Sequence, residues 1–271
     1  MTLSGTQIDS TARVDARAQL GEGVTIGPYC VIGPDVTIGE GCKLEAHIHV
    51  SGVTTIGART VVFPFAALGG APQSTGYRGG PTRLVIGEDC VIRESVTISR
   101  GTEDGPGVTE LGHHGFYMAC SHVAHDCRIG DHVVFANAAA VAGHCVVGDH
   151  VFMGGLSAAH QFTHIGSHAM IGGLSGLRGD VIPFGVVSGS TARMNGINVV
   201  GMRRRKFTAE SVRAVRNAYR MLFLAAGPLD ERIQALETAH GSDPAVASVL
   251  AFIRGPRKRP LCRARSGAAE D

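Results

Sequence analysis

A repeat of six residues constrains this chain more than any other feature. From Ile8 to Leu68 every sixth residue is Ile, Val or Leu, which makes eleven consecutive matches. A period of six is three times the strand period of two, so each hexad can form one short strand and one corner. Three hexads would then close one triangular coil of about 18 residues. The repeat therefore predicts a left-handed parallel β-helix.

Two further hexad positions fit a narrow prism. Glycine often follows the aliphatic residue, as at Gly21, Gly27, Gly33, Gly39 and Gly57. We expect a tight corner there, because glycine tolerates backbone angles closed to other residues. The residue four places after the aliphatic one is small or β-branched, and the chain has no Trp and an aromatic share of only 5%. Such an interior has room for aliphatic side chains but little for indole rings.

Most of the cysteines fall on that small position. Five of the seven do so, namely Cys30, Cys42, Cys90, Cys127 and Cys145. We interpret them as core residues, since free Cys packs as a small hydrophobe. The odd number and the lack of a CxxC motif argue against disulfides and a structural zinc. No leader pattern or membrane-length apolar run is present, so we expect a cytoplasmic protein.

The repeat is interrupted twice. Residues 69–82 are Gly- and Pro-rich, and the hexads then resume in phase at Ile86. A second excursion over residues 101–110 shifts the phase by one, and the hexads resume at Leu111. Loops on a rigid scaffold often carry specificity. We predict a β-helix domain over residues 1–200 whose coils end near residue 190, with both loops as candidate substrate contacts.

From about residue 201 the pattern becomes helical. Apolar residues at helical spacing predict a helix from Thr208 to Ala226, stopped by a Gly-Pro pair. Two shorter helices are predicted at about 229–239 and 244–254. We expect a helical domain over residues 201–255 and a disordered basic tail over residues 256–271.

Charge divides the chain at the same point. Residues 1–200 hold 11 Lys/Arg and 16 Asp/Glu, whereas residues 201–271 hold 14 and 7. The basic run from Arg203 to Lys206 lies at the junction, where it could face solvent, an acidic protein, a phosphate or a nucleic acid. Nucleic acid is the weakest option, because the chain has no recognition motif.

Histidines gather in the later coils. Ten of the thirteen lie between His113 and His168. His125 and His144 are 19 residues apart, and His144 and His160 are 16 apart, so we expect these imidazoles to stack on one edge with His122 nearby.

Three interpretations of the histidines stay open. Corner or outward positions without function suit His132, His150, His164 and His168. A zinc site would fit clustered imidazoles, and the region faintly resembles β-helical carbonic anhydrases. General-base catalysis is favoured, because Asp126 follows His125 and can hold the other ring nitrogen. No Ser, Cys or Lys with a matched base is apparent, which favours direct transfer over a covalent acyl-enzyme.

Ordered motifs make the interpretation more specific. They are His122-Val-Ala-His125-Asp126-Cys, Ala142-Gly-His144, His160-Gln161-Phe, Asn198-Val-Val-Gly-Met-Arg-Arg-Arg, Arg93-Glu-Ser-Val-Thr-Ile and Arg216-Asn-Ala-Tyr. Over nearly the whole chain, this sequence resembles the acyl-carrier-protein-dependent UDP-N-acetylglucosamine O-acyltransferases of lipid A biosynthesis. The resemblance implies a homotrimer with active sites between neighbouring prisms, an acyl carrier protein as donor and partner, and neither a metal site nor a bound cofactor.

The resemblance also implies residue roles. His125 would deprotonate the sugar 3-hydroxyl, Asp126 would orient it, and the Gly143 amide would stabilise the oxyanion. The sugar, diphosphate and acyl hydroxyl would be bound by Gln73, His122, His144, His160 and Gln161. The Gly155 amide would contact the phosphopantetheine arm, and Gly173 would leave room for a long acyl chain. The nucleotide or the carrier protein would contact Asn198, Arg204 and Arg205.

One departure from the family pattern leaves the acceptor open. Ser74 and Gly76 stand where many members carry an acidic residue and a lysine. The acceptor could therefore be the 3-hydroxy sugar nucleotide or its 3-amino analogue. A zinc lyase and a non-catalytic trimer that binds acidic proteins through its tail remain as alternatives from other classes.

Overall fold

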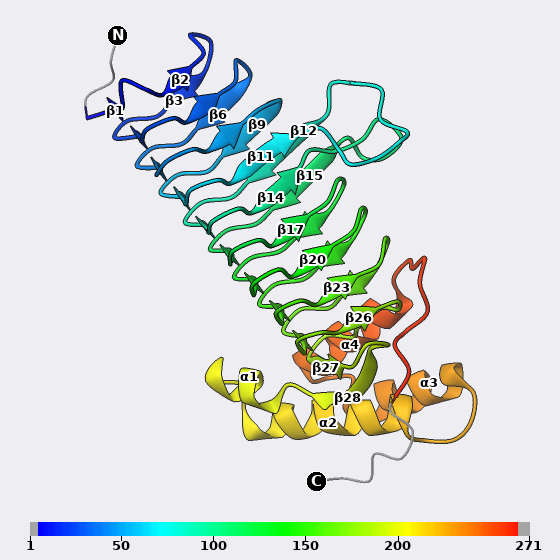
Figure 1. Ribbon diagram of the computed structural model, residues 1–271. Helices are drawn as coiled ribbons and strands as arrows, with labels where there is room; N and C mark the ends of the chain where they lie inside the picture. Colours follow the sequence, from blue (N-terminus) through cyan, green and yellow to red (C-terminus); the bar gives the residue numbers. More distant parts are fainter. Residues whose placement is uncertain (1–4, 265–271) are drawn as a thin grey trace.

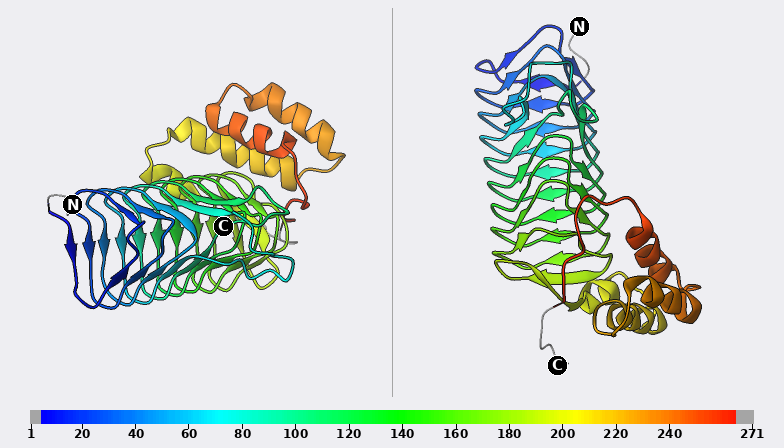
Figure 2. Two further views of the ribbon diagram at one scale, coloured as in Figure 1. Left: turned by 90° about the horizontal axis from the view of Figure 1, so that it is seen from above. Right: turned by 90° about the vertical axis from the view of Figure 1, so that its right-hand side faces the viewer.

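The computed structural model describes residues 5–264 and confirms the predicted β-helix (Figure 1). Short strands form the three sides of a prism, and helices pack at its far end (Figures 1 and 2). All strand pairs within the three sheets are parallel apart from β27 with β28. Within residues 5–264, none of the helices has the length and hydropathy needed to cross a bilayer.

Each side of the prism is one sheet. The first sheet contains β1 (Gln7–Ile8), β4 (Thr25–Ile26), β7 (Lys43–Leu44), β10 (Val61–Val62), β13 (Val91–Ile92), β16 (Phe116–Tyr117), β19 (Val134–Phe135), β22 (Phe152–Met153), β25 (Met170–Ile171), β27 (Gly185–Ser188) and β28 (Arg193–Ile197). The second sheet contains β2 (Arg13–Val14), β5 (Val31–Ile32), β8 (His49–Val50), β11 (Ala67–Gly70), β14 (Thr97–Ser99), β17 (His122–Val123), β20 (Ala140–Val141), β23 (Ala158–Ala159) and β26 (Gly176–Leu177). The third sheet contains β3 (Gln19–Leu20), β6 (Val36–Ile38), β9 (Val53–Ile56), β12 (Arg83–Ile86), β15 (Val108–Leu111), β18 (Arg128–Ile129), β21 (Val146–Val147) and β24 (His164–Ile165).

The hexad explains the register and the core. The aliphatic residues point inward and stack on their counterparts one coil later, as Ile26 does on Leu44. The five cysteines at the small position are buried, which confirms their interpretation as core residues. Burial raises the pKa of the Cys90 thiol to about 11, so this sulfur stays protonated and unreactive at neutral pH.

The corners do not lie where the glycines suggested. The left-handed backbone occurs three residues after the aliphatic one, for example at His47 and Phe65, with φ of 52° and 67°. The glycines one place after the aliphatic residue serve close packing instead. A Cβ on Gly21 would lie 2.5 Å from the Glu40 nitrogen, and one on Gly39 would lie 2.6 Å from the Ala58 nitrogen. The prediction that these glycines form the corners is wrong. Glycine is needed there because successive coils come too close for a side chain.

Both excursions leave the prism at one edge. The first connects β11 to β12 and the second connects β14 to β15, so each links the second sheet to the third. The second ends earlier than predicted, because β15 already begins at Val108. These loops stand out from the prism in Figure 1.

The chain after the last coil differs in several details from the prediction. The antiparallel strand β28 and the short helix α1 (Val199–Arg204) precede the predicted helices, which are α2 (Ala209–Phe223), α3 (Leu229–His240) and α4 (Pro244–Arg254). Thr208 caps α2 by accepting from the Ser211 amide. The apolar residues at helical spacing form the buried face of α2, which includes Val212, Val215, Ala218, Tyr219 and Leu222.

The disordered tail predicted for residues 256–271 is wrong over residues 256–264. This segment returns to the prism, where Leu261 pairs with Asp180 and Cys262 is buried. Leu261 pairs with a residue some eighty positions earlier in the chain, and such pairing leaves no pattern in the local sequence. The composition of the segment was therefore the only basis for predicting disorder. Residues 265–271 lie outside the described part of the chain.

Candidate active site

The candidate site lies on the edge between the second and third sheets, hereafter the second–third edge, whose corner residues are Asp126, His144 and Phe162. All three have left-handed backbone, with φ of 59°, 62° and 64°. The ring of His144 stacks on Phe162 at 4.6 Å and meets His125 edge-on at 5.1 Å. The coil spacing thus brings the predicted imidazoles of His125 and His144 together.

His125 and Asp126 form a buried pair. The His125 Nδ1 lies 2.8 Å from the Asp126 Oδ2, and the two side chains are 11% and 0% exposed. A carboxylate only accepts hydrogen bonds, so Nδ1 carries the proton and Nε2 keeps its lone pair. The pair therefore presents a proton acceptor at Nε2.

The second loop fixes the carboxylate. The backbone N–H and the hydroxyl of Thr102 both donate to Asp126, and the Asp126 amide donates to the Thr109 hydroxyl at 2.8 Å. A Cβ on Gly105 would lie 2.6 Å from the Asp126 carboxyl carbon, so the loop passes directly over it. Sequence reasoning missed these residues. The one-residue phase slip was the only signal that pointed to this loop.

Gly143 faces the reactive nitrogen. A Cβ there would lie 2.5 Å from Cε1 and 2.7 Å from Nε2 of His125. Only glycine leaves room for the ring in this position. The main chain at residue 143 is thereby held against the proton acceptor.

Two cavities flank this edge. One of about 290 Å³ opens on the second sheet and is lined by Gln73, His122, Ala124, His125, Ala140, Val141, Ala142, Gly143, Ala158, Ala159 and Gln161. The other, of about 360 Å³, opens on the third sheet and is lined by Pro106, Asp126, His144, Phe162, His164, Pro256, Arg257 and Lys258. The structure thus brings Gln73, His122 and Gln161 to the same cavity as His125 and Gly143.

Neighbouring imidazoles are kept neutral. Burial lowers the pKa of His122, whose Nδ1 lies 2.7 Å from the Thr97 hydroxyl. Burial also lowers the pKa of His144, and the charge of Lys258 adds to the effect. A neutral imidazole carries no charge, and it can both donate a hydrogen bond to a polar substrate and accept one from it. His125, Asp126 and His144 each offer one ligand atom within 4.8 Å of the others, but Nδ1 of His125 is already committed to Asp126.

Other predicted site residues lie on different edges of the same chain. Gly155 and Gly173 fall between the first and second sheets. Asn198 caps α1 and donates to the His168 carbonyl at 2.9 Å, while Arg205 donates to the His150 carbonyl at 3.2 Å, both on the edge between the third and first sheets. Arg204 is exposed in the last turn of α1. One chain alone does not gather these residues around His125.

His132, His150 and His168 occupy corner positions, as predicted. With His114 they form a ladder of parallel rings on the edge between the third and first sheets, at centroid distances of 4.6, 4.7 and 4.9 Å. Burial lowers the pKa of His168 to about 4. His164 lies instead on β24 and lines the larger cavity.

The repeat, the parallel prism and the buried histidine–aspartate pair define a hexapeptide-repeat transferase. The hexapeptide transferase model matches residues 5–38 and 17–52, and the model described as UDP N-acetylglucosamine O-acyltransferase, domain 2, matches residues 180–262. Together with full-length relatives that are 56% and 45% identical, these matches show that the chain belongs to the family of acyl-carrier-protein-dependent UDP-N-acetylglucosamine O-acyltransferases, and it is an acyltransferase.

The similarity to individual members extends over the whole chain. The enzyme of this name from Azorhizobium caulinodans is 56% identical over 266 residues, covering 97% of this chain and 98% of the relative. Its counterpart from Bartonella bacilliformis is 45% identical, covering 97% and 96%. The structure of LpxA from Acinetobacter baumannii matches with a TM-score of 0.92 at 40% identity, covering 94% of this chain and 99% of that one. Family membership decides against the lyase and the non-catalytic trimer.

Proposed function

We propose that this protein transfers a 3-hydroxyacyl chain from acyl carrier protein to the 3-position of UDP-N-acetylglucosamine, the first step of lipid A biosynthesis. The observation that carries the proposal is the His125–Asp126 pair, with a free Nε2 beside a cavity and against Gly143. The names of the relatives supply the substrate class.

The proposed reaction is a direct transfer. Nε2 of His125 takes the proton of the sugar 3-hydroxyl while the hydroxyl oxygen attacks the carbonyl carbon of the thioester. The resulting oxyanion accepts from the Gly143 amide, a contribution of about 2.7–4 kcal/mol for one such donor. The carbon–sulfur bond then breaks, and the imidazolium returns its proton to the departing thiolate. Asp126 stabilises the imidazolium in between, and a positioned base of this kind contributes about 100- to 10,000-fold in rate.

Acceptor binding falls to the polar residues around the smaller cavity. Gln73, His122 and Gln161 line it, and His144 and His160 lie on the same edge. Ser74 and Gly76 lie in the first loop, and a Cβ on Gly76 would lie 3.8 Å from the Asp104 carboxylate of the second loop. A carboxylate of the second loop therefore stands near the position at which many relatives carry a lysine. The relatives are named O-acyltransferases, which favours the hydroxy sugar over its amino analogue.

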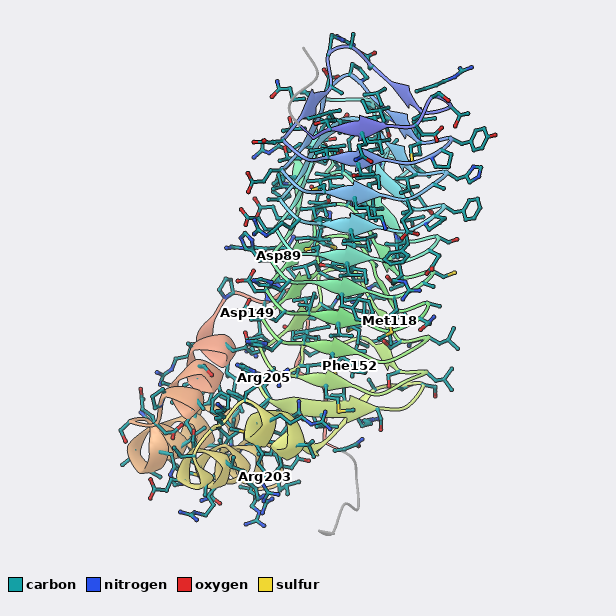
Figure 3. All side chains as sticks on the ribbon, turned by 90° about the vertical axis from the view of Figure 1, so that its left-hand side faces the viewer. Asp89, Met118, Asp149, Phe152, Arg203 and Arg205 are labelled. Carbon is teal, nitrogen blue, oxygen red and sulfur yellow. The ribbon has the colours of Figure 1, made fainter. Side chains whose placement is uncertain are left out.

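The functional assembly is a homotrimer in this proposal. Gly155, Gly173, Asn198, Arg204 and Arg205 can complete the site only from a neighbouring chain, since they lie on other edges. The prism also exposes apolar side chains that an interface would cover. Leu156 and Leu174 are 63% and 70% exposed on the corner beside the first sheet, and Figure 3 shows Phe152 on the face of the prism that is turned toward the viewer.

Acyl carrier protein, an acidic partner, is proposed to dock on the basic C-terminal part. Arg203, Arg213 and Arg216 line a cavity of about 300 Å³ on α1 and α2. Figure 3 shows Arg203 and Arg205 on the helices beside the prism. The phosphopantetheine of the carrier would supply the thioester, so no other cofactor is required. All seven cysteines are unpaired, which accords with a reducing cytoplasm.

The decisive experiment is a transfer assay. Acyl carrier proteins loaded with 3-hydroxyacyl chains of several lengths are incubated with UDP-N-acetylglucosamine or with its 3-amino analogue, and products are separated by mass spectrometry. We expect the ester product, with chains longer than ten carbons preferred because Gly173 lacks a side chain. If the amide forms preferentially, the acceptor is the 3-amino analogue and not UDP-N-acetylglucosamine. If neither sugar gives a product, the proposal is overturned.

A further inference from the structure

The C-terminal segment, residues 256–264, lies along the side of the prism on its way back from α4 (Figure 2, right). The Asp180 amide donates to the Pro260 carbonyl and the Cys262 amide to the Asp180 carbonyl, both at 2.8 Å. Cys262 is 5% exposed, and its thiol donates to the Gly179 carbonyl. Backbone pairing and a buried side chain therefore fix the segment independently of its charged residues.

From this anchored segment, Arg259 reaches two predicted site residues. One terminal nitrogen of its guanidinium lies 2.6 Å from Nδ1 of His160, and its Nε donates to the Gln161 carbonyl at 2.9 Å. Arginine can only donate hydrogen bonds, so Nδ1 of His160 carries the lone pair and the ring proton sits on Nε2. Arg259 thereby turns His160 into a donor at Nε2.

The contact with Gln161 extends the effect to the cavity. The Gln161 side chain lines the same cavity as His125 and Gly143, so a bond that holds its carbonyl also limits where that side chain can lie. The neighbouring Lys258 places its Nζ 4.2 Å from the centre of the Phe162 ring, which stacks on His144. Two consecutive cations of the segment thus contact the second–third edge.

We propose that Arg259 is a positioning residue for the acceptor substrate, acting through His160 and Gln161. It presents an Nε2 donor to an anionic or hydroxyl oxygen, the kind of acceptor that a diphosphate or a sugar supplies. The inference rests on the proposed function, because it requires that these two residues bind the sugar nucleotide.

The first test compares variants of the full-length chain. Arg259→Ala should lower kcat/KM for UDP-N-acetylglucosamine about tenfold, mainly through KM, as expected for loss of a hydrogen bond with a charged donor. Arg259→Lys keeps the charge but cannot make both contacts, and it should recover only part of the loss. Arg263→Ala, an exposed arginine of the same segment, is the matched control and should behave as the unaltered protein. The melting temperature of each variant checks that the segment stays folded.

A double-mutant cycle separates positioning from a general structural effect. In a His160→Ala background, Arg259→Ala should lower kcat/KM for UDP-N-acetylglucosamine by much less than tenfold, because the main partner of Arg259 is already gone. Free guanidinium should restore part of the activity of Arg259→Ala and none of that of His160→Ala.

Three outcomes are informative. Equal rates for Arg259→Ala and Arg263→Ala in an active enzyme would overturn the role of Arg259 alone. Full additivity with His160→Ala would also overturn it. An unaltered protein that transfers nothing would overturn the proposed function and, with it, this inference.

Discussion

Two edges of the prism carry histidines at or beside the left-handed corner position, yet their chemistry differs. On the edge between the third and first sheets, His114, His132, His150 and His168 stack on one another, and His168 also stacks on Phe184. On the second–third edge, His125 faces the buried carboxylate of Asp126, and both loops and the C-terminal segment approach. A histidine in this fold can act as a base only where a carboxylate partner and the surrounding loops hold it, and its position in the repeat alone does not give it that role.

Removal of the base tests this contrast most severely. His125→Ala should lower kcat by about 1,000-fold, within the range that a positioned general base contributes. His132→Ala, on the ladder, is the control and should retain most of the rate. Steady-state kinetics and size-exclusion chromatography measure turnover and assembly. A His125→Ala variant with near-normal turnover would contradict the assigned base.

Crowding the base should have the next largest effect. Gly143→Ala places a methyl 2.7 Å from Nε2 of His125, so the ring must move. A displacement of about 1 Å can cost about 100-fold in rate. Gly70→Ala is the control, since its Cβ would meet nothing within 4 Å. Comparable kcat values for the two variants would show that the close approach is unimportant.

Loosening the carboxylate should have a smaller effect. Thr102→Val removes the hydroxyl that donates to Asp126 and should lower kcat about tenfold, as one lost hydrogen bond to a charged group predicts. Thr102→Ser restores the hydroxyl and should recover most of the rate. If the serine variant is as slow as the valine variant, the shape of the loop matters rather than its hydrogen bond.

The ladder should respond to pH through stability. Burial holds the pKa of His168 near 4, with His150 and Arg205 lowering it further and Asp149 opposing them. Below about pH 6.5 the unfolded chain binds a proton at this residue that the folded chain does not, so the free energy of unfolding falls between pH 6.5 and 4. Above pH 6.5 this group has no effect.

His168→Phe keeps the stacked ring without the titration. Its free energy of unfolding, from urea denaturation at several pH values, should decline less on acidification than that of the unaltered protein. His240→Phe, on α3, serves as a control for general loss of a histidine. Identical pH profiles for the unaltered protein and His168→Phe would contradict the assignment.

Much of the site could be predicted because its residues are adjacent or coil-spaced. His125 and Asp126 are neighbours in sequence, and His144 follows one coil later. Thr102 and Arg259 could not be found in this way, because a loop and a distant segment bring them to the edge. Their positions depend on contacts such as that between Asp180 and Leu261, which leave no periodic signal.

The sequence by itself determined the prism, the buried cysteines and the histidine–aspartate pair, because a strict period of six dictates which side chains face inward and which recur on one edge. Tertiary structure decided where the corners fall, why the glycines are needed, and which imidazoles meet a carboxylate. It also brought residues 256–264 back to the prism. These features depend on the close packing of one coil on the next and on pairing between distant segments, and neither is written in any local pattern.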